Sequence, residues 1–237
     1  MATSPSSKAI DFIEAVLHLQ PKLAVFDCDG TLWAADAGEG FFDWEIKQGV
    51  VSEKIARWAR ARYAEYKAGK VDEDTMCAEM VTMHRGLEEA KVQNAATQYF
   101  DENLLGEIFP EMRQLIKRLQ KSGNDVWAVS STNVWVIRAA MRHFGIPESK
   151  ILAATVQIEN GMVTDHVVRV PSGEGKPQAI RDVIGEIPDA AFGNSRWDVE
   201  MLEIARHAFA VNPNPDLEQI AQQHRWKIYW PDGIRAT

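Results

Sequence analysis

The chain has 237 residues, a length that suits one sizeable domain or a core domain carrying a smaller insertion. Hydrophobic residues make up 46% and charged residues 25%, which fits a globular protein and excludes disordered, collagen-like and coiled-coil chains. With 26 Lys and Arg against 34 Asp and Glu, the net charge is −8, so we expect neither nucleic acid nor an anionic membrane as a partner.

The cysteine content and the hydropathy pattern predict a cytoplasmic protein. The two cysteines, Cys28 and Cys77, are too few for a disulfide framework, and Cys28 is expected to be a small buried residue that faces away from the site. The N-terminal residues lack the uninterrupted apolar stretch of a signal peptide. No apolar run approaches the roughly 18 residues that indicate a membrane span.

Strands and helices alternate along most of the chain. In chain order, the patterns predict a helix over 10–17, a strand over 23–26, mostly helix from 40 to 105, a helix over 111–121, a strand over 126–129, a helix over 133–144, strands over 151–158 and 162–170, a helix over 176–185, a strand over 190–193, a helix over 197–205, a strand over 208–211, a helix over 215–224 and a strand over 227–230. Asn160-Gly161 between two of these strands is typical of a hairpin turn. Such alternation indicates βαβ units and a mainly parallel sheet.

The segment between the first two strands is too long for a simple crossover. Residues 40–105 are dense in Glu, Lys and Arg, and their apolar residues recur at helical spacing. We therefore predict an α/β fold, a Rossmann-like parallel sheet flanked by helices, with an inserted α-helical cap. The predicted domains are a core formed by residues 1–37 and 108–237, and a cap formed by residues 38–107.

Polar side chains follow several of the predicted strands or open the next helix. Ligands of open α/β sheets bind beyond the carboxyl ends of the strands, so these side chains are the candidates for a site. They offer a nucleophilic carboxylate, a second carboxylate, hydroxyls, a cation and further oxygen ligands, which suits phosphoryl transfer assisted by Mg²⁺. The candidates are Asp27, Asp29, Thr31, Ser130, Ser131, Lys176, Asn194 and Asp198.

The same residues carry a resemblance to a known family. Asp27-Cys28-Asp29-Gly30-Thr31-Leu32, after an apolar strand, resembles the first motif of the haloacid dehalogenase superfamily. Ser130, Lys176 and Gly193-Asn194-Ser195-Arg196-Trp197-Asp198 resemble the remaining three motifs, in the same order. The resemblance covers nearly the whole chain from Leu23 onward. The position of the cap, soon after the first motif, is similar to the phosphoserine-phosphatase-like branch.

The resemblance implies catalytic and phosphate-binding roles. Asp27 would attack phosphorus and become an aspartyl phosphate, and Asp29 would protonate the leaving alcohol and then activate water. Lys176 would take part in catalysis and would hold the transferring phosphoryl group together with Ser130 and Ser131.

The resemblance also implies a metal site. Mg²⁺ would be held by Asp27, by the backbone carbonyl of Asp29, by Asn194 and by Asp198. The family usually has Asp at the position of Asn194. An amide oxygen can still bind Mg²⁺, but the lost negative charge is expected to weaken the affinity for the metal.

Aromatic and acidic residues follow the predicted nucleophile closely, among them Trp33, Asp36, Glu39 and Trp44. One interpretation is that the aromatic residues pack between cap and sheet. The other is a substrate-pocket wall, which suits a cationic leaving group through cation–π and charge attraction. In the phosphoserine-phosphatase pattern, an acidic residue nine positions after the nucleophile contacts the substrate amine, and Asp36 has this spacing from Asp27. The second interpretation predicts an amine-bearing phosphomonoester resembling phosphoserine, phosphocholine or phosphoethanolamine.

Three functions follow from these features. The leading hypothesis is a Mg²⁺-dependent phosphomonoester hydrolase acting through an aspartyl phosphate on a small molecule. A dehalogenase on the same fold is the second, although Asp29 argues against it, because cleavage of a carbon–halogen bond needs neither an acid for the leaving group nor a metal. The third is a non-catalytic phosphate-binding or partner-binding protein whose metal site is weakened by Asn194. The sequence does not indicate an oligomeric state.

Overall fold

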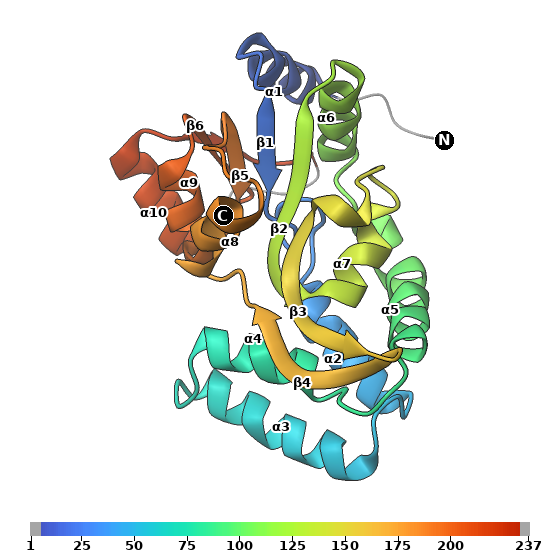
Figure 1. The fold of residues 1–237 in the computed structure, drawn as a ribbon. Coiled ribbons are helices and arrows are strands. Elements are labelled where there is room, and N and C mark those ends of the chain that lie inside the picture. Colours follow the sequence, from blue (N-terminus) through green and yellow to red (C-terminus); the bar gives the residue numbers. More distant parts are fainter. Residues whose placement is uncertain (1–5, 233–237) are drawn as a thin grey trace.

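A single seven-stranded sheet runs through the part of the chain that the computed structural model describes, residues 6–232 (Figure 1). The strands lie in the order β4-β3-β2-β1-β5-β6-β7, and only the pair β3 and β4 is antiparallel. The strands are β1 (Leu23–Phe26), β2 (Asp125–Asn133), β3 (Ile151–Glu159), β4 (Met162–Arg169), β5 (Ala190–Gly193), β6 (His207–Val211) and β7 (Lys227–Tyr229). The prediction of an α/β fold with a mainly parallel sheet is confirmed.

Helices cover the sheet and fill the long segment between its first two strands. They are α1 (Ser7–His18), α2 (Ala37–Lys47), α3 (Glu53–Lys67), α4 (Glu73–Thr82), α5 (Glu89–Asn103), α6 (Pro110–Lys121), α7 (Val134–Met141), α8 (Gly175–Val183), α9 (Val199–Ile204) and α10 (Pro215–His224), with short 3₁₀ turns η1 (Leu105–Glu107), η2 (Glu148–Lys150) and η3 (Arg196–Asp198). None of the helices within residues 6–232 combines the length and the apolar character needed to span a membrane.

The central strand β1 is buried on both faces, which explains its uninterrupted run of apolar residues. Phe26 belongs to one hydrophobic cluster, with side chains from α1, α6 and α7. Val25 belongs to the other, with side chains from α8, α9 and α10. The side chains of a strand alternate between its faces, so this burial fixes the register of β1 and places the residues that follow it at the edge of the sheet.

The Asn-Gly hairpin joins β3 and β4 as predicted. Asn160 and Gly161 have φ angles of 51° and 78°, the left-handed values that a tight primed turn requires. The hairpin carries the sheet toward the inserted helices, where α4 packs on both β3 and β4 (Figure 1).

The four helices α2 to α5 occupy the segment for which the sequence predicts a cap, and none of its described residues belongs to a strand of the sheet. The limits of the two domains stay a prediction, and residues 1–5 and 233–237 of the expected core lie outside the described residues.

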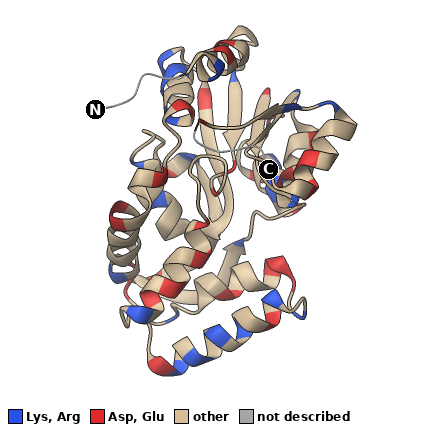
Figure 2. Cartoon of the chain, turned by 180° about the vertical axis from the view of Figure 1, so that it is seen from behind, with Lys and Arg blue, Asp and Glu red and all other residues tan. Residues whose placement is uncertain are grey.

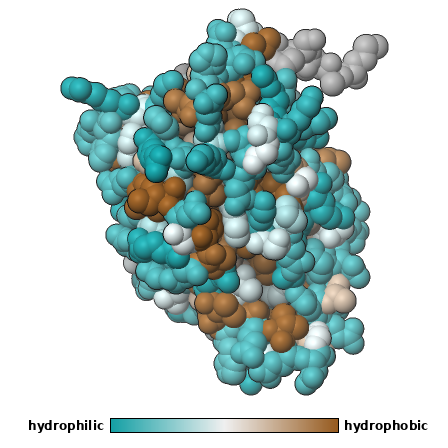
Figure 3. All heavy atoms as spheres, turned by 45° about the horizontal axis from the view of Figure 1, so that its top comes forward, coloured by the Kyte–Doolittle hydropathy of each residue, from teal (hydrophilic) through white to brown (hydrophobic). Residues whose placement is uncertain are grey.

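The molecular surface carries mixed charges and small apolar groups. Figure 2 shows acidic and basic residues interspersed along the helices. On the face seen in Figure 3, hydrophilic side chains predominate and hydrophobic ones gather only in small groups.

A buried pair of titratable side chains ties α2 to the end of α4. The Nε2 atom of His84 lies 2.6 Å from an Oε atom of Glu45, and its Nδ1 atom lies 3.2 Å from the carbonyl oxygen of Val81. His84 is fully buried and Glu45 is 1% exposed. Burial lowers the pKa of the imidazole, but the Glu45 carboxylate outweighs it, and the net effect raises the pKa of His84 above its usual range.

Replacing His84 with glutamine is expected to lower the free energy of unfolding by roughly 3–5 kcal/mol, since Glu45 is left buried without a charged partner. The stability that protonated His84 contributes is present in full below the pKa of an unfolded histidine, about 6.5. It is lost as the pH rises through the higher pKa of the folded state. Chemical denaturation across this range checks the prediction, with exposed His166→Gln as the control. An advantage of wild type over His84→Gln that grows with pH would contradict it.

Candidate active site

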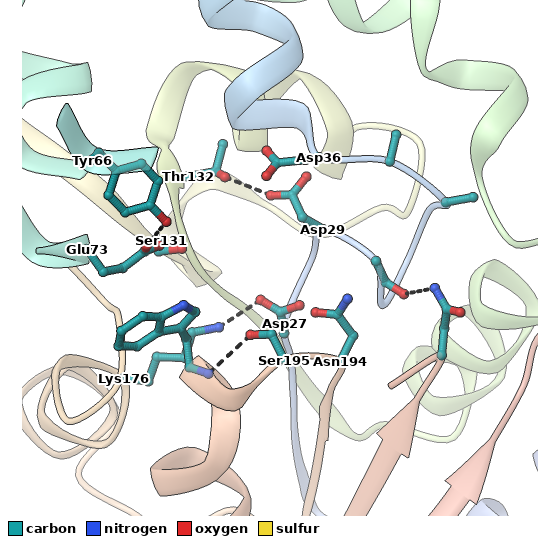
Figure 4. Close-up of a pocket in the computed structure, with 15 residues that line it drawn as sticks. Asp27, Asp29, Asp36, Tyr66, Glu73, Ser131, Thr132, Lys176, Asn194 and Ser195 are labelled. Carbon is teal, nitrogen blue, oxygen red and sulfur yellow. Dashed lines mark hydrogen bonds and ion pairs between the residues drawn. The ribbon is translucent and has the colours of Figure 1, made fainter. Parts of the chain in front are cut away.

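A cleft of about 400 Å³ lies at the carboxyl ends of the strands, where the sequence predicts the site. Asp27 and Asp29 follow β1, Asn194 follows β5, and Lys176 lies in the first turn of α8. All four line the cleft (Figure 4). Residues distant in the sequence therefore meet because parallel strands end at the same edge of the sheet.

Asp27 and Lys176 form the floor of the cleft. The Nζ atom of Lys176 donates to Oδ1 of Asp27 at 2.7 Å, to Oδ1 of Asp198 at 2.5 Å and to the carbonyl oxygen of Val129 at 3.1 Å. The hydroxyl of Thr31 donates to the second oxygen of Asp27 at 2.8 Å. Lys176 is 1% exposed and Asp27 is 6% exposed. The carboxylate of Asp27 is thus held on both oxygens and aimed into the cleft.

The floor is short of positive charge. Burial, followed by the nearby charge of Asp198, raises the pKa of Asp27 to about 6, although Lys176 opposes this. Burial disfavours the charged form of Lys176, but the carboxylates of Asp198 and Asp27 outweigh it and raise the pKa of its ammonium group above the usual range. Lys176 therefore stays protonated between two carboxylates.

Asp29 is held by three donors. Its Oδ1 atom accepts the indole N–H of Trp33 at 2.9 Å and the backbone N–H of Ala37 at 2.6 Å, and its Oδ2 atom accepts the hydroxyl of Thr132 at 2.7 Å. Burial and then the charge of Asp36 raise the pKa of Asp29 to about 7. A carboxyl group with this pKa is able both to give and to take a proton near neutral pH.

Asn194 presents an oxygen atom to the nucleophile. In Figure 4 the amide oxygen of Asn194 points toward the carboxylate of Asp27, and the side chain of Asn194 makes no hydrogen bond to any residue between 6 and 232. A Cβ atom at Gly30 would lie 1.8 Å from Nδ2 of Asn194, so the close approach of this side chain depends on glycine. Two oxygen atoms that face each other without a hydrogen between them fit a bound cation, and oxygen ligands of this kind suit Mg²⁺.

Asp198 has a different environment from the other predicted metal ligands. It is fully buried and does not line the cleft. One oxygen accepts from Lys176, and the other accepts the backbone N–H groups of Asn194 and Ser195, both at 2.9 Å. In this arrangement Asp198 orients Lys176 and the loop that carries Asn194, and its role as a direct metal ligand stays a prediction.

The serines predicted to bind phosphate lie on a longer strand than expected. β2 continues through Asn133, and α7 begins only at Val134. Ser130 is buried and its hydroxyl accepts the N–H of Thr132 at 3.1 Å. Ser131 and Thr132 line the cleft, so they are the members of this run that can meet a ligand directly.

Neither Trp33 nor Trp44 lines the cleft, and contact of these side chains with a substrate stays a prediction. Trp33 is fully buried against Phe100, at 5.3 Å between ring centroids, and its N–H is used by Asp29. Trp44 packs against Tyr99, at 5.9 Å between ring centroids. Both positions agree with the alternative of core packing, and Trp33 also positions Asp29.

The two acidic residues of the predicted wall differ. Asp36 caps α2 by accepting the N–H of Glu39 at 2.8 Å, and it lines both the cleft and a smaller adjoining pocket of about 90 Å³. Glu39 lines only the adjoining pocket and pairs with Lys67 at 3.3 Å.

Several polar residues that the sequence does not single out as ligands also line the cleft. Thr132 extends the run of hydroxyl residues after the predicted strand, a signal that could have identified it. Ser195 lies within the fourth motif, next to Asn194, and the others lie on helices or loops without a motif of their own. These residues are Tyr66, Glu73, Thr132, Ser195 and Asn212.

Residues 24–203 match the family model described as haloacid dehalogenase-like hydrolase. The chain belongs to this family, which confirms the resemblance carried by its four motifs. The prediction of a phosphoric monoester hydrolase is confirmed at the level of the family. Curated relatives of this chain include proteins that are named phosphatases.

Particular relatives are distant in sequence. A histidinol-phosphatase of Neisseria meningitidis serogroup C is 24% identical over 87% of this chain and 97% of its own. A protein of unknown function from Bordetella pertussis Tohama I has a TM-score of 0.76 at 21% identity, over 87% of this chain and 97% of that one. A substrate-bound phosphoserine phosphatase has a TM-score of 0.57 at 19% identity, over 88% of this chain and 92% of that one. The two structures share the fold.

Proposed function

We propose that the protein is a Mg²⁺-dependent phosphatase that hydrolyses a small, amine-bearing phosphomonoester through an aspartyl phosphate on Asp27. The observation that carries this proposal is the floor of the cleft, where the carboxylate of Asp27 is held at 2.7 Å from Lys176 and at 2.8 Å from Thr31. A fixed carboxylate beside a buried ammonium group suits attack on phosphorus, because the cation attracts the phosphoryl oxygens.

Asp27 and Asp29 divide the first step between them. An oxygen of Asp27 forms a bond to phosphorus while the bond from phosphorus to the ester oxygen breaks. Asp29, protonated, gives its proton to the departing oxygen, so the leaving group is a neutral alcohol. Trp33 and Thr132, which donate to Asp29 at 2.9 Å and 2.7 Å, keep this carboxyl group in place.

The second step releases phosphate and restores the enzyme. Asp29, now ionised, takes a proton from water while the water oxygen attacks phosphorus. The bond between phosphorus and Asp27 breaks, which gives inorganic phosphate and the free carboxylate. Lys176 remains charged throughout and holds phosphoryl oxygens with donors from Ser131 and Thr132.

Asp27, the backbone carbonyl of Asp29 and the amide oxygen of Asn194 would hold the Mg²⁺ ion. When bound, the ion neutralises part of the charge of the phosphoryl group and of the surrounding carboxylates. The need for Mg²⁺ follows from the charge balance of the cleft. Its described lining residues include four acidic side chains, and Lys176 is the single basic one among them.

Asn194→Asp is expected to lower the Mg²⁺ concentration for half-maximal activity about tenfold, because it adds a negative charge to the ligand set. Asn194→Ala, which removes the oxygen ligand, is expected to raise it. Mg²⁺ titrations of phosphatase activity check both changes. The matched control is Asn214→Asp, which adds the same charge at the N-cap of α10, outside the cleft. Equal responses of the two Asp variants would contradict the metal site.

A panel of phosphomonoesters, assayed with Mg²⁺ and with excess chelator, tests the proposed function. Hydrolysis that needs Mg²⁺ supports it. Turnover that is undiminished by the chelator would contradict the metal dependence, and no hydrolysis of any ester would contradict the phosphatase. Release of halide from a haloacid would favour the dehalogenase instead.

A further inference from the structure

The cleft has an acidic wall opposite its catalytic floor, formed by Asp36, Tyr66 and Glu73. Asp36 is the N-cap of α2, Tyr66 lies in the last turn of α3, and Glu73 is the first residue of α4. All three line both the cleft and the adjoining pocket. Figure 4 shows Tyr66 beside Glu73, with Asp36 on the side of Asp29. The inserted helices therefore present this wall to whatever part of a substrate lies beyond the phosphoryl group.

The carboxylates of the acidic wall are fixed in place but carry no counter-charge. The hydroxyl of Tyr66 donates to one oxygen of Glu73, and the thiol of Cys77 donates to the other at 3.6 Å. Asp36 accepts a backbone N–H at 2.8 Å. Neither Asp36 nor Glu73 forms an ion pair with any other residue in the range 6–232. A cation in the cleft would relieve the repulsion that two such carboxylates cause.

The basic side chains that line the cleft and the adjoining pocket, Lys176 and Lys67, pair with other carboxylates. Lys176 is held by Asp27 and Asp198 on the floor, and Lys67 pairs with Glu39 in the adjoining pocket.

The arginines of α3, the helix with several basic residues in Figure 2, do not neutralise the carboxylates of the acidic wall either. Arg62 pairs with Glu79 and Glu65, and Arg57 and Arg60 are exposed and do not line the cleft. A carboxylate on the leaving group would therefore meet the acidic wall without a basic side chain to receive it.

We propose that the acidic wall selects phosphate esters of small amino alcohols, which carry a protonated amine and no carboxylate, and disfavours phosphorylated amino acids. Asp36 and Glu73 are the specificity-determining residues, and the ring of Tyr66 borders the same space as a partner for the ammonium group. The cleft of about 400 Å³ suits a ligand of this size. This inference rests on the proposed phosphatase function and narrows its substrate class.

Three esters that differ only beyond the phosphate test the inference: phosphoethanolamine, phosphoserine and ethyl phosphate. In wild type with Mg²⁺, we expect kcat/KM for phosphoethanolamine to exceed that for each of the other two at least about tenfold, the difference that one well-placed charge interaction makes. Glu73→Gln, which keeps an acceptor for Tyr66, and Asp36→Asn, which keeps the helix cap, are each expected to reduce these ratios severalfold.

Asp74→Asn is the matched control. It removes the same charge from the same first turn of α4, but Asp74 is exposed and does not line the cleft. We expect it to leave the ratios of wild type unchanged. A wild-type enzyme that prefers phosphoserine, or ratios that respond equally to Glu73→Gln and Asp74→Asn, would overturn the acidic wall as the selector. Hydrolysis of ethyl phosphate without a preference for the amine overturns the specificity alone, whereas no hydrolysis of any ester overturns the phosphatase as well.

Discussion

Replacing Asp27 with asparagine is expected to reduce kcat for any phosphomonoester by at least about 10³-fold, the scale on which enzymes respond to loss of their nucleophile. The amide has no negative charge and is a poor nucleophile toward phosphorus. Steady-state assays with a generic aryl phosphate and Mg²⁺ measure this change. Hydrolysis by Asp27→Asn at the rate of wild type would show that another group attacks phosphorus.

The fold of Asp27→Asn should survive the change. Burial and the charge of Asp198 raise the pKa of Asp27 to about 6, so the folded protein disfavours its ionised form relative to the unfolded chain. Lys176 keeps its second partner, Asp198, at 2.5 Å. A melting temperature equal to or above that of wild type at neutral pH would therefore accompany the loss of activity. A large fall in melting temperature would mean that the activity was lost through misfolding.

Replacing Lys176 with methionine is expected to lower the free energy of unfolding by roughly 3–5 kcal/mol, because it leaves buried carboxylates without their counter-charge. We also expect kcat to fall by about 10² or more, since the phosphoryl group loses its fixed cation. Denaturant titration and steady-state kinetics measure the two effects. The control is Lys117→Met, an exposed lysine of α6.

A double variant isolates the charge effect of Lys176. Adding Asp27→Asn to Lys176→Met removes one of the two carboxylates that the lysine contacts. The stability that Asp27→Asn restores in the Lys176→Met background should exceed any gain that it gives in wild type, so the two changes should not be additive in the unfolding free energy. Strict additivity would contradict the coupling that the site geometry requires.

Much of the fold follows from local patterns in the sequence. The apolar run of β1 predicts a strand buried on both faces, and Asn160-Gly161 predicts the turn between β3 and β4. The carboxyl-end rule for parallel strands then brings Asp27 and Asn194 to one edge of the sheet, which is where both lie. Each of these inferences depends on short-range chemistry that a sequence displays directly.

The remainder of the site depends on side-chain direction, which periodicity does not reveal. Trp33 is of a residue type that suits a substrate wall, yet its side chain is buried in the core and donates a hydrogen bond to Asp29. Tyr66 and Glu73 lie on inserted helices and resemble ordinary polar residues of an amphipathic helix. Only the packing of α3 on α4, and of α4 on β2, β3 and β4, turns them toward the cleft. The extension of β2 to Asn133 likewise accompanies the pairing of Asn133 with Ala154 of β3, which no local pattern indicates.

Mass spectrometry of wild-type enzyme quenched in acid during turnover identifies the residue that attacks phosphorus. We expect one phosphoryl group on the peptide that contains Asp27. Hydroxylamine should remove it, as expected of an acyl phosphate, and it should be absent from Asp27→Asn treated in the same way. A phosphoryl group attached to a different residue during turnover would contradict the assignment of Asp27 as the nucleophile.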